Sequence, residues 1–380
     1  MTRAVTQLAS PLYDFEHSFW HNVIVSQREL TYGEVTSIKK ITDHIGYLKK
    51  TYGVTNETDF LGRRVIAPVR IEPGPAYGSR NLLRAMELGW PILSQKTVRM
   101  RFYPGKHEDK RYPNVAPCEG SLEEGFVVSD SFTGTATNAF AMGSWSAYGG
   151  EDERDVGWVN DLKPFARNLP EGKMLIISVV YNADAKSNEE IIKQYAEAAF
   201  TAKKAGAHAA EANLSCPNTV GKADDLYKDA NFSAKILGAM RDRVGPDFPL
   251  GLKVGYDKGY GPLVEETARF VDYYTGINAI GGEVKYPDGS LALPQTPKSG
   301  IGGAAIKHFG LEAAKKLVHA AKKHDKKTIS AGGITIADDA LEYFNVAGSD
   351  VVGVASAAIF RPIIPLEIQE ALLMDKISKR

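Results

Sequence analysis

The sequence is poor in cysteine and has no excess of charge of either sign. Its 380 residues include two cysteines, Cys118 and Cys216. This number argues against a disulfide framework and excludes a four-cysteine zinc or iron–sulfur site within the chain. Lysine and arginine total 46, as do aspartate and glutamate, so the formal net charge is zero. No electrostatic feature therefore points to nucleic acid or to an anionic membrane surface as a partner.

Long apolar segments are also missing. No run of about 18 or more apolar residues occurs, so no membrane span is expected, and residues 1–16 lack the apolar core of a secretory signal. No Gly-x-Gly-x-x-Gly fingerprint follows a predicted strand, which argues against a self-contained nicotinamide-binding domain. With 43% hydrophobic and 24% charged residues, the composition is that of an ordinary globular protein, and we expect a soluble cytoplasmic protein without a metal site.

Strands and helices alternate from about residue 170 to the end of the chain. Residues 174–181 form an apolar run of strand length, and Ser187-Asn-Glu-Glu190 resembles a capping box that opens a helix. Helices are predicted near 81–88, 230–244, 262–273, 310–324 and 337–347. Two further strands are predicted upstream, so that eight strands begin near residues 65, 91, 174, 208, 250, 276, 328 and 350. Eight βα units favour a closed (β/α)8 TIM barrel of the α/β class over an open sheet.

Three segments fall outside the repeating βα unit. Residues 1–55 are predicted to form an N-terminal helical extension, with a helical pattern from about Tyr32 to Tyr52, ahead of a barrel domain over 56–380. This extension would brace the bottom of the barrel or make a subunit contact. Residues 97–173 after strand two and 281–309 after strand six are long insertions, which in compact domains are usually lids or binding loops.

The segment that follows the fourth predicted strand carries the most chemical information. It reads Asn213-Leu-Ser-Cys216-Pro217-Asn218, with Gly221-Lys222 nearby. Asparagine amides suit a planar ring that itself carries amides, and a thiol can move a proton when its pKa lies near the working pH. On these residues alone, an ordinary Asn/Pro turn with a buried cysteine is an equal alternative.

Other predicted strand ends carry a lysine and several glycines. Lys253 lies in an apolar strand, where it needs a partner unless it extends to the barrel rim. Three segments, which contain Gly302-Gly303, Gly332-Gly333 and Ala355-Ser356, combine small residues with predicted helix starts or with the ends of strands seven and eight. Such segments favour a phosphate site in a barrel, the alternative being three unrelated tight turns.

The Asn-Leu-Ser-Cys-Pro-Asn loop resembles the hallmark loop of the dihydroorotate dehydrogenase family, nearest to its soluble branch with a cysteine base. The resemblance covers roughly residues 60–365. It implies FMN as cofactor, oxidation of a CH–CH bond, and conversion of dihydroorotate to orotate in pyrimidine biosynthesis. Cys216 would be the catalytic base, and Lys96 would contact flavin and substrate. The implied substrate ligands are Asn138, Asn213, Asn218 and Asn278, and the implied FMN ligands are Lys96, Lys253, Gly302, Gly303, Gly332, Gly333, Ala355 and Ser356.

Departures from the family pattern concern mainly the substrate side. Ala279 replaces a usual hydroxyl residue, residues 138–145 differ from the family's substrate loop, and Glu72-Pro73 stands where the family has Ala-Ser. A divergent paralogue acting on a dihydropyrimidine or another cyclic amide is therefore the first alternative. An aldolase-type barrel with Lys253 as a Schiff base, and a barrel that binds FMN without catalysis, are the others.

The electron acceptor and the assembly follow from resemblance alone. A soluble acceptor such as fumarate, or a partner redox protein, is expected. The family also includes homodimers, although the sequence identifies no interface.

Overall fold

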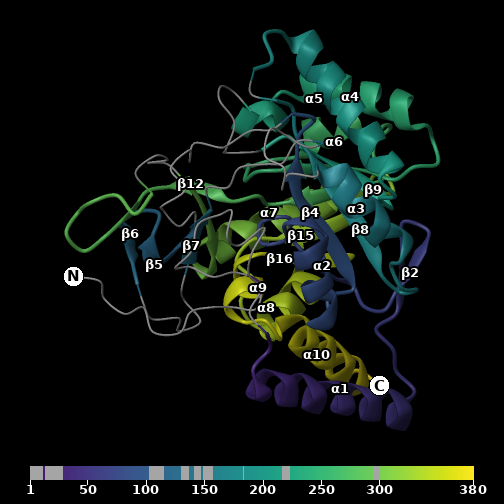
Figure 1. Ribbon diagram of the computed structural model, residues 1–380, viewed down its shortest axis with the longest axis vertical. Helices are drawn as coiled ribbons and strands as arrows, with labels where there is room; N and C mark the ends of the chain where they lie inside the picture. The colour runs from purple at the N-terminus through teal and green to yellow at the C-terminus, as the bar shows by residue number, and fades with distance from the viewer. Residues whose placement is uncertain are drawn as a thin grey trace.

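Eight parallel strands close into a barrel in the computed structural model of the chain (Figure 1). The structure describes residues 12, 29–101, 115–129, 137–140, 147–148, 157–182, 184–215, 223–293 and 299–380. The barrel strands, in chain order, are β3 (Val69–Ile71), β4 (Ile92–Val98), β8 (Met174–Val179), β9 (Ala209–Asn213), β10 (Leu250–Val254), β11 (Tyr273–Gly276), β15 (Lys327–Ala331) and β16 (Val351–Val354). The predicted TIM barrel is thereby confirmed.

Helices follow these strands and cover the outside of the barrel (Figure 1). Local signals fix their ends: the Ser187 side chain accepts a hydrogen bond from the Glu190 amide at the start of α4, and the Asp229 side chain caps α5 in the same way. The helices are α2 (Gly78–Glu87), α3 (Trp158–Arg167), α4 (Asn188–Lys204), α5 (Ala230–Val244), α6 (Gly261–Thr267), α7 (Lys307–Lys322), α8 (Ala337–Glu342), α9 (Ser356–Phe360) and α10 (Ile364–Ser378), with short helical turns at Ala223–Lys228, Ala304–Ile306 and Tyr343–Ala347.

Two predicted strand positions are wrong. Strand one begins at Val69 rather than near residue 65, because Val65 belongs to an antiparallel hairpin of β1 (Thr58–Phe60) and β2 (Arg63–Val65). Phe60 and Val65 pack at one end of the barrel with Tyr273 and other strand residues. Strand six begins at Tyr273 rather than near residue 276, and the preceding helix ends at Thr267. The Tyr273 ring fits inside because Gly251 has no Cβ, which would lie 2.1 Å from that ring.

The N-terminal helix α1 (Tyr32–Tyr52) has the predicted bounds. Thr31 and Glu34 form a capping box at its start, and Gly53 ends it in the left-handed conformation. The helix runs beside α10 (Figure 1), and a small apolar cluster that includes Ile45 and Leu373 joins the two. The extension therefore contacts the C-terminal helix of the same chain, while the domain division at residue 55 stays a prediction.

The two long insertions together build a second sheet beside the barrel (Figure 1). The first supplies β5 (Val115–Ser121), β6 (Gly125–Val128) and β7 (Thr137–Phe140), and the second supplies β12 (Ile280–Gly282), β13 (Val284–Lys285) and β14 (Ser299–Gly303). The strand order is β12-β14-β7-β5-β6-β13. Glycines of β14 pair with Thr137 and Asn138 of β7, so the sheet joins segments that are far apart in the sequence.

Among the residues that the structure describes, no helix is both long enough and apolar enough to span a bilayer.

Candidate active site

A cavity of about 950 Å³, open space at its mouth included, lies at the C-terminal ends of the barrel strands. Each strand contributes at or near its end, which is where barrel enzymes place their active sites. Many of the residues predicted for cofactor or substrate line this one cavity: Lys96, Asn213, Lys253, Asn278, Gly302, Gly303, Gly332, Gly333, Ala355 and Ser356. The structure brings these residues together, and their individual roles remain proposals.

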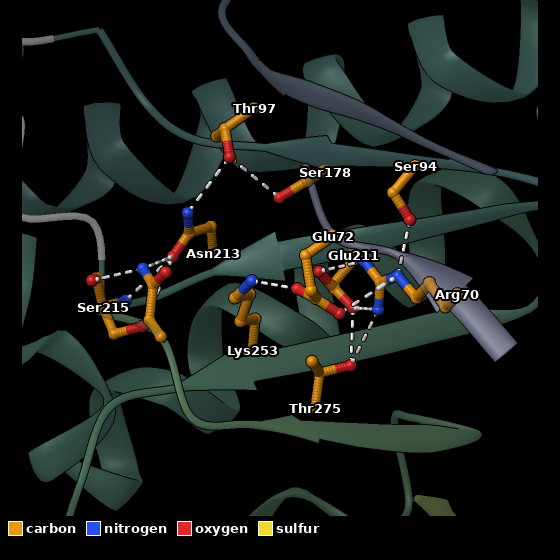
Figure 2. A network of polar contacts seen from close by, with 11 residues as sticks. Arg70, Glu72, Ser94, Thr97, Ser178, Glu211, Asn213, Ser215, Lys253 and Thr275 are labelled. Carbon is orange, nitrogen blue, oxygen red and sulfur yellow. Dashed lines mark hydrogen bonds and ion pairs between the residues drawn. The ribbon is translucent and has the colours of Figure 1, made fainter. Parts of the chain in front are cut away.

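A bidentate ion pair between Arg70 and Glu211 occupies the barrel interior below the cavity (Figure 2). The guanidinium nitrogens donate to the two carboxylate oxygens at 2.7 and 2.9 Å, and both side chains are fully buried. Arg70 Nε also donates to Ser94 Oγ at 2.5 Å, and the Thr275 hydroxyl donates to Glu211 at 2.6 Å. Every charge in this group therefore has a directed partner, as a buried ion pair requires.

Burial and pairing act in opposite directions on these two groups. Burial alone would raise the pKa of Glu211, but Arg70, Lys253 and the Thr275 hydroxyl lower it on balance. Burial alone would lower the pKa of Arg70, and the carboxylates of Glu211 and Glu72 raise it instead. The pairing therefore favours the charged form of both groups.

A second ion pair joins Glu72 and Lys253 at the floor of the cavity (Figure 2). Glu72 directly follows β3 and Lys253 lies in β10, and Lys253 Nζ donates to Glu72 Oε2. Both residues line the cavity, although only 2% of Glu72 and 5% of Lys253 is exposed. Lys253 thus has the charged partner that was expected for a lysine in an apolar strand, and this partner comes from the other side of the barrel.

Two asparagine amides are held against each other beside this pair. Asn278 Nδ2 donates to Asn213 Oδ1 at 3.3 Å and to the Ser215 carbonyl at 2.8 Å. Asn213 Nδ2 donates to Thr97 Oγ1 at 3.1 Å, and Thr97 is within 3.1 Å of the Ser178 hydroxyl. The orientation of both amides is therefore fixed before any ligand binds, as a site that reads a planar ring needs.

Side chains of β4 alternate between the inside and the outside of the barrel. Ser94 points inward to Arg70, and Gln95 points outward, where its side-chain oxygen accepts from the Gly78 amide at 2.9 Å. Lys96 points inward again and lines the cavity. Ser94 and Gln95 thus have structural partners, and the lysine keeps the position that the prediction gave it.

Glycines form the opposite wall of the cavity. Gly332 and Gly333 have φ of 119° and 78°, and a Cβ on Gly333 would lie 2.3 Å from the backbone of Lys307. A side chain at position 333 is therefore excluded by both conformation and space. In the same wall, Ser356 Oγ is buried and has no hydrogen-bond partner in the described part of the chain. A buried hydroxyl of this kind favours a ligand with acceptor oxygens.

Three predicted site residues cannot be placed. Cys216 and Asn218 lie outside the described residues, and only the backbone of Asn138 is described, paired with Gly302. Conversely, the sequence did not single out Arg70, Glu211 or Arg99. Arg99 lines the cavity, and its Nε donates to the Tyr181 carbonyl at 2.9 Å. Arg70 and Glu211 could have been identified from the sequence, because each is a charged residue within an otherwise apolar strand.

Comparison with known proteins identifies the family of the chain. The sequence pattern of the family described as dihydroorotate dehydrogenase matches residues 156–374. The chain belongs to the dihydroorotate dehydrogenase family. This membership confirms the predicted family and the predicted enzyme class, a dehydrogenase. The described part of the chain contains no group of His, Cys, Asp or Glu side chains that could hold a metal ion.

Similar proteins span most of the chain. "Dihydroorotate dehydrogenase" of Dictyostelium discoideum is 24% identical over 337 residues, which cover 81% of this chain and 86% of that protein. "Dihydroorotate dehydrogenase B (NAD(+)), catalytic subunit" of Thermotoga petrophila is 32% identical over 221 residues, covering 56% of this chain and 74% of that protein. The crystal structure of the Eimeria tenella enzyme in complex with ferulenol has a TM-score of 0.63 at 14% identity, covers 90% of this chain and 92% of its own, and shows the same fold.

Proposed function

We propose that the protein is an FMN-dependent dehydrogenase that oxidises dihydroorotate to orotate in pyrimidine biosynthesis. The observation that carries this proposal is the convergence of two lysines, two fixed asparagine amides and the glycine wall on one cavity, in a chain of this family. The relatives named dihydroorotate dehydrogenase support the same substrate.

The cavity suits FMN in size and in chemistry. It lies at the ends of all eight barrel strands and is open to solvent at its mouth, as a site for a molecule of this size requires. Gly332, Gly333 and the Ser356 hydroxyl, which has no hydrogen-bond partner among the described residues, offer a phosphate end without side chains in the way. Lys96 supplies positive charge elsewhere in the cavity, where the flavin ring and the substrate would lie, and Lys253 lies at the floor in its ion pair with Glu72.

The residues of the chain have separable roles in the proposed reaction. When bound, FMN would supply the hydride acceptor. Asn213 and Asn278 hold the amide groups of the substrate ring and fix its orientation. Cys216, as thiolate, takes a proton from the carbon alpha to a carbonyl, while the adjacent C–H bond gives up its hydrogen as hydride and a C=C bond forms. Lys96 contacts both ligands and favours their negative charge.

A related cyclic amide, such as a dihydropyrimidine, is the second candidate substrate. Ala279 lines the cavity beside Asn278 and offers no hydroxyl to a ligand. A substrate with one fewer hydrogen-bonding group would fit this wall without leaving a polar atom unpaired.

The partners and the location are proposals as well. A soluble acceptor or a partner redox subunit would take the electrons. Relatives are named as a fumarate enzyme in Lactococcus lactis and as an NAD-linked catalytic subunit in Thermotoga petrophila. With two cysteines in the chain, a four-cysteine iron–sulfur relay would have to lie on another chain. We further propose a cytoplasmic protein that forms a homodimer.

An anaerobic absorbance spectrum before and after addition of dihydroorotate tests the proposal. We expect a flavin spectrum that bleaches on addition. A flavin that stays oxidised with dihydroorotate but bleaches with a dihydropyrimidine would transfer the function to the second candidate. A protein that takes up no FMN after reconstitution would contradict the proposed function altogether.

A further inference from the structure

The Glu72 carboxylate is held in place from three sides of the cavity floor. Its Oε2 accepts from Lys253, its Oε1 lies 3.4 Å from Arg70 Nε, and its backbone amide donates to the Val354 carbonyl at 2.9 Å. A Cβ on Gly353 would lie 2.2 Å from Oε1, so the carboxylate occupies space that only glycine leaves open. The fold therefore fixes the position of the Glu72 carboxylate at the cavity floor.

The charges around the cavity make this carboxylate unusual. The described lining residues include the cations Lys96, Arg99 and Lys253, and Glu72 is the single carboxylate among them. A cavity that served only to bind a phosphate-bearing cofactor would gain from every uncompensated cation. The ion pair instead cancels the positive charge of Lys253 at the floor, and this cancellation needs another reason.

We propose that Glu72 lowers the reduction potential of the bound flavin by compensating the charge of Lys253, an inference that rests on the proposed function. The flavin ring gains negative charge on reduction, and a nearby cation stabilises that charge more strongly in a site of low dielectric constant. A carboxylate paired with this cation removes most of the stabilisation. Glu72 acts on the cofactor through Lys253 and is a positioning residue. The consequence is a bound flavin that passes its electrons on readily.

The test compares the wild-type protein with the isosteric variant Glu72→Gln, both reconstituted with FMN. We expect the midpoint potential to rise by about 30 mV or more, since a tenfold change in a two-electron equilibrium corresponds to about 30 mV. Sulfite, which adds to oxidised flavin and leaves negative charge on the ring, should bind at least ~10-fold more tightly to the variant. Neither readout depends on turnover.

Two further variants separate charge from packing. Glu197→Gln removes a carboxylate from the exposed side of α4, where Glu197 pairs with Arg243, and should leave potential and sulfite affinity unchanged. Lys253→Met keeps Glu72 without its partner and should lower the potential below that of the wild type. This second variant carries the test if Glu72→Gln does not fold.

The outcomes distinguish this inference from the proposed function. A wild-type protein that takes up no FMN would contradict the proposed function. FMN uptake with an unchanged potential and sulfite affinity in Glu72→Gln, or an unchanged potential in Lys253→Met, would overturn the role of Glu72 and leave the proposed function intact.

Discussion

Two ion pairs lie close together in the barrel, and they differ in what surrounds them. Arg70 and Glu211 are fully buried, and each is bonded to further hydroxyl groups. Glu72 and Lys253 lie nearer the strand ends and face the cavity, and Glu72 Oε1 makes no hydrogen bond within the described chain. A buried ion pair gains little net stability even with ideal geometry, but removal of one partner is costly. The deep pair therefore fixes the barrel interior, while the cavity pair lines the space where a ligand would bind.

The largest expected effect comes from Glu211→Gln. Arg70 would stay charged and buried, its bidentate partner would be lost, and only the more distant Glu72 carboxylate, at 3.4 Å, would remain as a counterion, so we expect the free energy of unfolding to fall by about 3 kcal/mol. Glu72→Gln removes a carboxylate that lines the cavity and leaves the Arg70–Glu211 pair intact, and should cost less than half as much. Urea denaturation of both variants measures the difference. Equal losses would contradict the assignment of separate roles to the two pairs.

A variant that touches neither pair separates chemistry from structure. Cys216→Ala should leave FMN bound and slow reduction of the flavin by substrate about 10²-fold, since the proposed base is lost. Anaerobic stopped-flow absorbance gives this rate. Cys118→Ala is the matched control, because Cys118 is buried in β5 away from the cavity. An unchanged rate in Cys216→Ala would remove Cys216 from the mechanism.

Ser356→Ala tests the proposed phosphate end of the cavity. Its buried hydroxyl has no partner among the described residues, so its removal should change the stability of the cofactor-free protein by no more than about 0.5 kcal/mol. A lost hydrogen bond to a phosphate should weaken FMN binding roughly 10-fold. Fluorescence titration with FMN and thermal unfolding give the two values. Unchanged FMN affinity would place the phosphate elsewhere.

At neutral pH the smallest effect should arise outside both pairs, at His208 just before β9. Burial and the charge of Arg63 lower the pKa of His208 from 6.5 to about 4, and its Nδ1 accepts from the Leu175 amide. The unfolded chain then binds a proton more readily than the folded one, so stability falls as pH drops from about 6.5 to 4. His208→Gln should flatten this part of the pH–stability profile, measured by denaturation at several pH values, and an unaltered slope would contradict the assignment.

The barrel was predictable because its signals are local. Apolar runs of strand length, the Ser187 cap and the repeated βα spacing lie within short windows of sequence. Errors occurred at Val65 and Tyr273, where an apolar residue belonged to a neighbouring element. The second sheet was missed, because its pairing joins two insertions that are separated in the sequence by the barrel strands β8 to β11, and no local pattern encodes such pairing.

The site residues that lie at the end of one strand could be predicted from the sequence, whereas the contacts between distant strands could not. The lysines, asparagines and glycines line one cavity, as expected from the rule for strand ends. The partner of Lys253 could not be found in this way, since Glu72 is 181 residues away. Arg70 and Glu211 are 141 residues apart, and only the closure of the barrel brings them together.

The pairing of β14 with β7 bears on the order in which the molecule folds. β14 carries Gly302 and Gly303 of the cavity wall, and its partner strand lies more than a hundred residues earlier in the chain. Contacts between such distant segments form late, because loop closure has to precede them, whereas neighbouring βα units form early. The pairing of β16 with β3, which closes the barrel, joins segments that are even further apart in the sequence. We therefore expect the neighbouring βα units to form first, and the closed barrel and the ligand-holding wall to form together afterwards.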